Sequence, residues 1–288
     1  MYRSLEEICK EAAATGCSFW ELIQKDDCRE RQIAQEESFV QLPRMYQAMK
    51  EADQDYDETL HSRSGLVGTD GGKLEHYVEQ EEPICGDFLG RVMEKAVKMG
   101  ESNACMKRIV AAPTAGACGV VPAVFLSMQE KYHYTDEEMT KALYVAAGIG
   151  GVIASRAFIA GAQGGCQAEI GSASAMAAGG AVHLRGGSAE AVAHAAAMAL
   201  KNLLGLVCDP VAGLVEVPCV KRNVSGAVVA LSAADMALAG VRSRIPPDEV
   251  IDAMREVGIS MPACLRETGE GGLAATPEGI KMRDRIMD

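Results

Sequence analysis

The sequence predicts a mainly α-helical protein, and three observations support this fold class. Long stretches place apolar residues at helical spacing, whereas alternating runs and clusters of β-branched residues, which indicate strands, are scarce. Alanine and glycine are dense over residues 142–240, as expected where helix backbones pack closely. Aromatic residues make up only 5% of the chain, so small side chains fill much of the predicted core.

Four helices are predicted in the first hundred residues. Leu5, Ile8 and Ala12 follow one another at helical spacing and define the apolar face of the first. The predicted helices cover residues 3–15, 19 to about 34, about 39–52 and about 84–99. Between the third and the fourth, residues 61–73 break the helical pattern and are predicted to form a loop.

The second half is predicted to be helical nearly throughout. Thr135 and Glu138 form a capping box that starts a helix running towards Arg156. Further helices are expected at about 171–183, 189–204, 225–240 and 247–257, the last ending at Gly258. We predict one catalytic domain over residues 1–288, with N-terminal helices over 1–60 and the binding core over 61–288.

Charge and hydropathy exclude two classes of partner. The net charge of −12 argues against a nucleic acid, because phosphates would be repelled. The most apolar stretch, 142–162, contains Arg156 and consists mostly of alanine and glycine, so we expect a buried helix and no membrane span. The N-terminus lacks the apolar core of a signal peptide, and the protein is expected to be cytoplasmic.

The loop at 61–73 combines flexible backbone with many polar side chains. Its glycines leave backbone N–H groups free to surround a carboxylate. Its functional side chains are His61, Ser62, Arg63, Ser64, Thr69 and Lys73. We predict that Ser62, Ser64, Gly65, Thr69 and Lys73 bind substrate; the alternative is an ordinary surface connection.

A second candidate for anion binding is the turn at 113–116. A glycine-containing turn before a helix presents N–H groups to a ligand, and Thr114 adds a hydroxyl group there. The P-loop string GxxxxGK[ST] is absent, so a nucleotide-binding P-loop is not indicated.

Three of the ten cysteines stand in unusual surroundings. Cys166, Cys208 and Cys219 are each flanked by glycine or proline and by polar residues, unlike a cysteine kept for packing. Three thiolates can hold an iron–sulfur cluster and leave one iron open as a Lewis acid. The remaining cysteines are interpreted as small core residues, and those singled out are Cys9, Cys17, Cys28, Cys85, Cys105 and Cys264.

Polar residues beside these cysteines leave several roles open. Arg222 and Asn223 could bind cluster sulfurs or a substrate carboxylate. Glu169 and Asp209 fit an acid–base role and a structural role equally well. The glycine-rich segment 266–279 could close over a site. No lysine has the setting of a pyridoxal phosphate Schiff base, and the GxSxG hydrolase motif is missing.

Several segments resemble the iron–sulfur-dependent L-serine dehydratases. They are SGLVGTDGGK at 64–73, PTAGACGVVPAV at 113–124, GGCQAEIGSASAMAA at 164–178, GLVCDPVAGLVEVPCVKRN at 205–223 and LRETGEGGLAATPEG at 265–279. The resemblance implies a [4Fe–4S] cluster on Cys166, Cys208 and Cys219, and a mostly helical catalytic domain. It also implies conversion of L-serine to pyruvate and ammonia without pyridoxal phosphate. The chain has the size of a separate catalytic α subunit, so a smaller β subunit is expected as partner.

Three other functions remain open from the sequence. The substrate could be L-cysteine, or another hydroxy acid, or the chain could be a non-catalytic subunit with structural cysteines. If the chain dehydrates serine, a base must remove the α-proton. His61 is the only imidazole in the substrate-like loop and is our candidate for this base.

Overall fold

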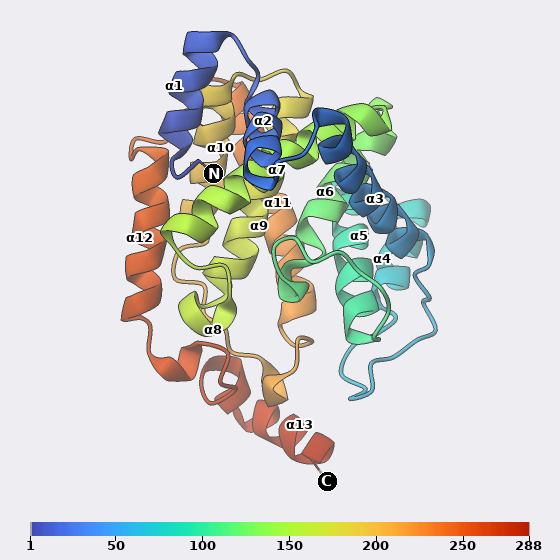
Figure 1. Cartoon of the computed structure of the whole chain (residues 1–288). Helices are drawn as coiled ribbons and strands as arrows, with labels where there is room; N and C mark the ends of the chain where they lie inside the picture. The colour runs from blue at the N-terminus through green and yellow to red at the C-terminus, as the bar shows by residue number, and fades with distance from the viewer. Residues whose placement is uncertain (1, 288) are drawn as a thin grey trace.

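The computed structural model describes residues 2–287, and thirteen α-helices account for most of this range. Within it no β-strand forms, and β-pairing is limited to the isolated bridges His61–Gly68 and Cys208–Arg266. The predicted mainly α fold class is therefore confirmed. Figure 1 shows a bundle of helices with the C-terminal helix extending below it.

Five helices cover the first part of the chain. They are α1 (Leu5–Thr15), α2 (Phe19–Arg31), α3 (Gln35–Gln54), α4 (Asp70–Gln80) and α5 (Gly86–Ala104). The third begins at Gln35, earlier than predicted, and continues through Pro43 to Gln54. Helix α4 was not predicted: Gly71 and Gly72 made its first turn resemble a loop, but both are buried against neighbouring side chains.

The other helices cover the rest of the chain. They are α6 (Val120–Tyr132), α7 (Asp136–Arg156), α8 (Gly161–Gly164), α9 (Ser172–Leu184), α10 (Ala189–Lys201), α11 (Cys219–Leu238), α12 (Pro247–Ser260) and α13 (Pro277–Met287). The predicted capping box is present, since Thr135 Oγ1 accepts from the Glu138 amide at 3.2 Å and Glu138 accepts from the Thr135 amide at 2.7 Å.

The predicted extents of three further segments were wrong. Helix α11 starts at Cys219, six positions before the predicted 225. Helix α12 continues through Gly258 to Ser260, because Gly258 lies against Gly164 and serves close packing there instead of ending the helix. The apolar stretch 142–162 is not one helix: α7 stops at Arg156, whose guanidinium group pairs with Asp252 at 2.6 Å.

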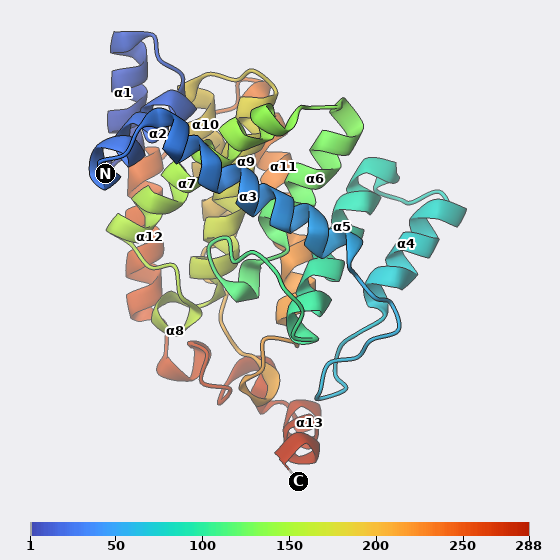
Figure 2. The same ribbon diagram turned by 45° about the vertical axis from the view of Figure 1, so that its right-hand side comes forward.

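Helix α9 is the centre of the core, with α6, α7, α10 and α11 packed around it (Figure 2). All of its residues from Ser172 to Val182 are buried. Its glycines allow close approach: a Cβ on Gly180 would lie 2.3 Å from Phe125 Cζ, and one on Gly179 would lie 2.2 Å from Ile149 Cδ1. The dense alanine and glycine thus serve helix packing, as the sequence predicts.

The interpretation of six cysteines as core residues was wrong in part: none is fully buried, although Cys9 and Cys17 pack against the core. Cys85 is exposed, and Cys9, Cys17, Cys28, Cys105 and Cys264 are only partly buried. Most lie near helix ends, where one side of the residue faces solvent. The four buried cysteines are Cys118, Cys166, Cys208 and Cys219. Among the helices at 2–287, none has both the length and the apolarity that crossing a membrane requires.

Candidate metal centre

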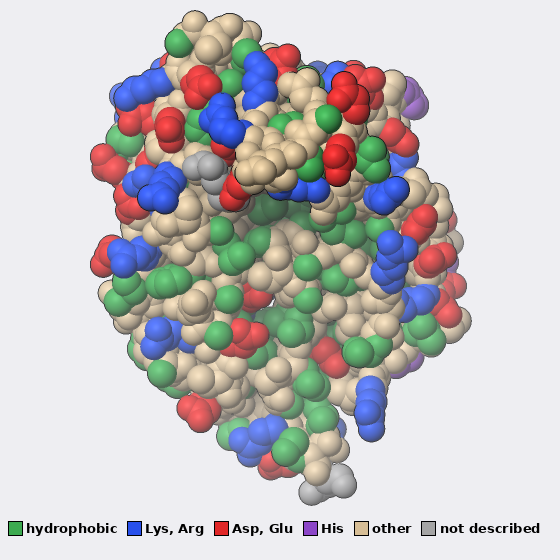
Figure 3. Space-filling view, viewed as in Figure 1, with side chains coloured by type: hydrophobic (Ala, Val, Ile, Leu, Met, Phe, Trp, Pro, Cys, Tyr) green, Lys and Arg blue, Asp and Glu red, His purple; other side chains and the backbone are tan. Residues whose placement is uncertain are grey.

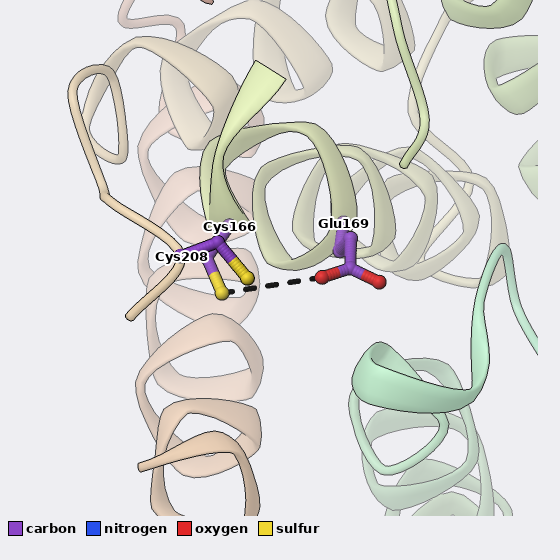
Figure 4. Close-up of side chains that lie close together, drawn as sticks. All are labelled: Cys166, Glu169 and Cys208. Atoms are coloured by element: carbon purple, nitrogen blue, oxygen red, sulfur yellow. Dashed lines mark hydrogen bonds between the residues drawn. The ribbon is translucent and has the colours of Figure 1, made fainter. Parts of the chain in front are cut away.

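Two thiols and a carboxylate lie close together at one buried point of the protein. Cys166 Sγ, Cys208 Sγ and an oxygen of Glu169 all lie within 4.8 Å of one another. Figure 4 shows the three side chains turned toward each other from two separate segments of backbone. Cys166 is 3% exposed and Cys208 is 2% exposed. These are donor groups that bind transition metals.

The backbone around each thiol is fixed by hydrogen bonds to distant segments. Gly165 has φ +76, a left-handed conformation that suits glycine, and turns the chain just before Cys166. The next amide, from Gln167, donates to Leu206 O at 3.0 Å. Cys208 donates its amide to Leu265 O at 2.8 Å, and its carbonyl accepts from the Glu267 amide at 2.7 Å. Hydrogen bonds from the backbone at Leu265 and Glu267 therefore fix the segment that bears Cys208.

The third cysteine stands at the first residue of α11. Cys219 is 7% exposed, and burial raises the pKa of its thiol to about 12, with further increases from the charges of Cys166 and Glu169. It lies near these groups but outside the set within 4.8 Å. At a helix N-terminus the partial positive charge favours a thiolate, the form that binds metals.

The thiols of Cys166 and Cys208 interact with each other and with one cation. Their contact lowers the pKa of Cys166 and raises that of Cys208. Arg222 Nη1 lies 3.6 Å from Cys166 Sγ and donates to Val207 O at 2.8 Å. Arg222 therefore places a positive charge beside a buried thiol and ties α11 to the segment before Cys208.

Asp209 and Glu169, left equivalent by the sequence, occupy different settings. Asp209 is 3% exposed; it pairs with Arg222 Nη2 at 2.8 Å and accepts from the Leu273 amide at 2.8 Å. These contacts give it a structural role. Glu169 faces the thiols instead, with one oxygen 4.0 Å from Cys166 Sγ. Burial raises the pKa of Glu169, and the charge of Glu267 raises it further.

The backbone at residue 161 lies close against a thiol and a carboxylate of the site, which only glycine allows. A Cβ on Gly161 would lie 2.7 Å from Glu169 Oε2, 2.9 Å from Cys208 Sγ and 3.2 Å from Glu267 Oε2. Any larger residue would collide with groups from three segments. Figure 3 shows the face of the molecule hollowed near its centre, with acidic side chains at the hollow.

The loop at 61–73 is anchored to the protein by two buried carboxylates. Ser62 donates to Glu216 at 2.8 Å, and Ser64 donates to the same carboxylate. Glu216 is 7% exposed and lies in the segment between Cys208 and Cys219. The two predicted substrate-binding serines therefore bind a side chain from the cysteine-bearing segment.

The loop amides also have a partner within the chain. Glu101 accepts from the amides of Gly68, Asp70 and Gly71 at 3.1, 3.0 and 3.1 Å. The loop does form a nest of amides, as its glycines suggest. A carboxylate of the protein itself occupies that nest and fixes the start of α4.

The other candidate residues of this loop lie towards solvent. His61 is exposed at the start of the loop, and Gly65 is exposed with φ +74. Lys73 is exposed and pairs with Asp70 at 2.7 Å. Thr69, with φ +70, is the residue before α4. His61 is not one of the groups that lie within 4.8 Å of one another at the thiols.

Thr114 and Asn223 hold parts of the site together. Thr114 Oγ1 donates to Glu169 Oε1 at 2.7 Å. The Asn223 side chain, 1% exposed, accepts from the Gly119 amide at 2.8 Å and donates to Gly116 O at 2.9 Å. Asn223 thus joins the predicted anion-binding turn to α11, and its amide group is occupied by protein partners.

Sequence reasoning missed Glu101, Glu216 and Glu267. Glu216 lies inside the motif that contains two of the cysteines, and this position was the available signal. Glu267 likewise lies inside the segment at 265–279 that carries the resemblance. Glu101 gave no signal, because it acts through contacts distant in sequence.

Fold and site together define an all-helical protein, over its described residues, that gathers cysteine thiols and a carboxylate at an interior point. The family described as serine dehydratase alpha chain matches residues 14–274. The chain belongs to this family.

Three relatives show how far the similarity extends. The chain is 46% identical over 287 residues to the probable L-serine dehydratase, alpha chain, of Bacillus subtilis (strain 168), covering 100% of this chain and 96% of that one. It is 41% identical to the L-serine dehydratase, alpha chain, of Peptoniphilus asaccharolyticus, covering 98% and 96%. L-serine dehydratase 1 of Escherichia coli (strain K12) is 45% identical over 62% of this chain and 40% of that longer protein.

Proposed function

We propose that this chain is the catalytic α chain of an iron–sulfur-dependent L-serine dehydratase, which converts L-serine to pyruvate and ammonia. The observation that carries the proposal is the meeting of Cys166 and Cys208 with Glu169 at a buried point, next to the helix start that bears Cys219. Full-length relatives named as L-serine dehydratase alpha chains support the reaction and its substrate.

The residues present fit a [4Fe–4S] cluster. Thiolates are the protein ligands that such clusters use, and three of the four buried cysteines lie in this region. Gly161 adds no side chain beside Cys208, where a Cβ would lie 2.9 Å from the thiol sulfur. Cys166, Cys208 and Cys219 would hold the cluster. Bound there, it would supply one iron without a cysteine ligand as a Lewis acid for the substrate hydroxyl group.

The surrounding residues would perform the other tasks of the elimination. Arg222 supplies positive charge beside the Cys166 thiol and would attract the substrate carboxylate. His61, in a loop that Ser62 and Ser64 anchor to Glu216, would remove the α-proton as the hydroxyl group leaves. The resulting enamine becomes an imine, which water hydrolyses to pyruvate and ammonia. No lysine is needed for a Schiff base in this scheme.

We infer that a smaller β chain completes the enzyme. Relatives that align over the full length of this chain carry the name alpha chain, whereas the E. coli protein is much longer than the matched region. The separate α chain would therefore contain the cysteines, and its partner would supply the remaining part of the longer protein.

Anaerobic purification followed by iron and sulfide analysis and a pyruvate assay tests the proposed function. L-serine and L-cysteine are compared side by side, with and without the partner chain. We expect iron and sulfide in the protein and faster release of pyruvate from L-serine. Sulfide release from L-cysteine at a higher kcat/KM would reassign the substrate, and a protein without iron would contradict the proposal.

A further inference from the structure

Glu169 has one oxygen bound and the other directed at the thiols. Thr114 Oγ1 holds Oε1 at 2.7 Å, while Oε2 lies 4.0 Å from Cys166 Sγ. Oε2 also lies beside Gly161, where an added Cβ would be 2.7 Å from Oε2 and 2.9 Å from Cys208 Sγ. We propose that Glu169 is a fourth protein ligand of the metal centre, binding through Oε2 the iron that no cysteine holds until substrate arrives.

The kinds of metal-binding atom that meet at this point support the assignment. Among residues 2–287, Cys166, Glu169 and Cys208 form the group of thiol, imidazole and carboxylate ligands that meets within 4.8 Å. A carboxylate oxygen is a regular iron ligand in proteins. A ligating carboxylate is itself hydrogen-bonded as a rule, which fixes its orientation, and Thr114 supplies that bond here.

Glycines pack against the Glu169 carboxylate from two segments of the backbone. A Cβ on Gly116 would lie 3.1 Å from Glu169 Oε1, and a Cβ on Gly161 would lie 2.7 Å from Oε2. Two glycines thus let the backbone pack closely against both oxygens of the carboxylate. This side chain follows Cys166 by one turn, and the irregular helical turn at Gln167–Gly171 places both groups on the same side.

The other carboxylates near the thiols do not meet these conditions. Asp209 is engaged by Arg222 and by the Leu273 amide. Glu267 is an exposed residue. Its Oε2 would lie 3.2 Å from a Cβ on Gly161, farther than Glu169 Oε2 at 2.7 Å. Glu169 is therefore the carboxylate whose free oxygen faces the thiols, and Glu267 is its matched control.

This role rests on the proposed function but makes a separate claim. Glu169 would hold the iron through Oε2 only until substrate binds there, while Thr114 would keep Oε1 in place. The exchange of one oxygen ligand for another would transfer no electron. A protein ligand at this iron in the absence of substrate would slow its loss to solvent and oxidants.

The test compares the holoprotein with Glu169→Gln, Glu267→Gln and Thr114→Val, each purified anaerobically. After a brief exposure to air, electron paramagnetic resonance measures the three-iron form, and iron analysis measures the metal retained. We expect Glu169→Gln to lose the fourth iron roughly tenfold faster than wild type or more, the scale of a lost contact at a metal site. Thr114→Val should be intermediate, and Glu267→Gln should match wild type.

Equal rates of iron loss in Glu169→Gln and wild type would overturn the assignment, even if turnover were lost. So would an equal acceleration in Glu267→Gln. Circular dichroism checks the helical content of each variant. If Glu169→Gln fails to fold, Glu169→Asp is tested in its place: its shortened carboxylate should also speed iron loss, and a wild-type rate would overturn the assignment. A wild-type protein without iron would refute the proposed function instead, so the two failures are distinguishable.

Discussion

At the residue scale, the four buried cysteines divide by what surrounds them. Cys118 is enclosed by apolar core, and its thiol lies 3.6 Å from Met99 O. Cys166, Cys208 and Cys219 are equally buried but lie beside Glu169 or Arg222. A buried cysteine without polar neighbours indicates a packing role, whereas a buried cysteine beside charged groups and other thiols indicates metal binding.

Replacing any of the three site cysteines should abolish iron retention. We expect Cys166→Ala, Cys208→Ala and Cys219→Ala each to lack a stable cluster and lyase activity, because two cysteines cannot retain it. Iron and sulfide analysis after anaerobic reconstitution measures this. Cys118→Ala is the matched control, equally buried and expected to keep iron; Cys17→Ala and Cys28→Ala should keep it too. A full cluster in one of the first three variants would remove that cysteine from the ligand set.

His61 and Ser64 should affect turnover without affecting iron. We expect His61→Ala to lower kcat by roughly a hundredfold or more, as loss of a general acid–base group commonly does. Ser64→Ala, which removes a hydroxyl group bound to Glu216, should mainly raise KM. Kinetics at equal iron content measure both changes. Near-wild-type constants for both variants would show that the loop is only a surface connection.

At the element scale, close packing of helices and anchoring of the glycine-rich loop determine where the site lies. Helix α9 is buried along most of its length and leads from the turn that bears Cys166 and Glu169 into the core. Helix α11 begins with Cys219 and packs against α9. Each helix therefore brings one part of the site to the same end of the bundle.

Adding one methyl group to α9 should be costly. In Gly180→Ala the new Cβ would lie 2.3 Å from Phe125 Cζ, so the ring or the helix must shift. We expect the free energy of unfolding to fall by about 1–3 kcal/mol, as for overpacked cores. Denaturant unfolding measures this change. The double variant Gly180→Ala/Phe125→Leu should lose less stability than the sum of the losses in the two single variants. A loss in the double variant equal to that sum would contradict the proposed contact.

The carboxylate of Glu101 should stabilise the start of α4. Glu101→Gln replaces one acceptor oxygen by a donor and leaves at least one loop amide without a partner. We expect a loss of about 1–3 kcal/mol in the free energy of unfolding, the cost of an unsatisfied buried group. Amide hydrogen exchange at Gly68, Asp70 and Gly71 should become faster. The exposed Glu82→Gln is the control, and unchanged exchange in Glu101→Gln would exclude this anchor.

At the scale of the whole molecule, the fold class was predictable and the assembly of the site was not. Thr135 and Glu138 predicted the start of α7 because a capping box is a local signal. The start of α4 was missed because its glycines serve tertiary packing, which a local pattern does not reveal. The pairing of Ser62 with Glu216 joins residues far apart in sequence, and so does that of Thr114 with Glu169.

Some features of the candidate site could be predicted from the sequence and others could not. The surroundings of Cys166, Cys208 and Cys219 indicated a metal centre from sequence, because glycine, proline and charge beside cysteine are visible there. The loop amides were recognised as a nest, but their partner Glu101 lies on another helix. Roles that depend on which distant side chain completes a contact require the fold.

The full enzyme should need a second chain. We expect the purified α chain to bind iron but to turn over L-serine much more slowly alone than with a β chain. Size-exclusion chromatography and a pyruvate assay on the chain alone and on the co-expressed pair measure this. Full turnover by the isolated chain at ordinary concentrations would contradict the need for a partner.

The central claim is that this helical fold brings three cysteines together to hold an iron–sulfur cluster. Its most direct test is iron and acid-labile sulfide analysis of the anaerobically purified chain beside a triple variant, Cys166→Ala/Cys208→Ala/Cys219→Ala. We predict about four iron and four sulfide per wild-type chain, the content of one [4Fe–4S] cluster, and none in the triple variant. Equal metal content in the two proteins, or none in either, would contradict the account.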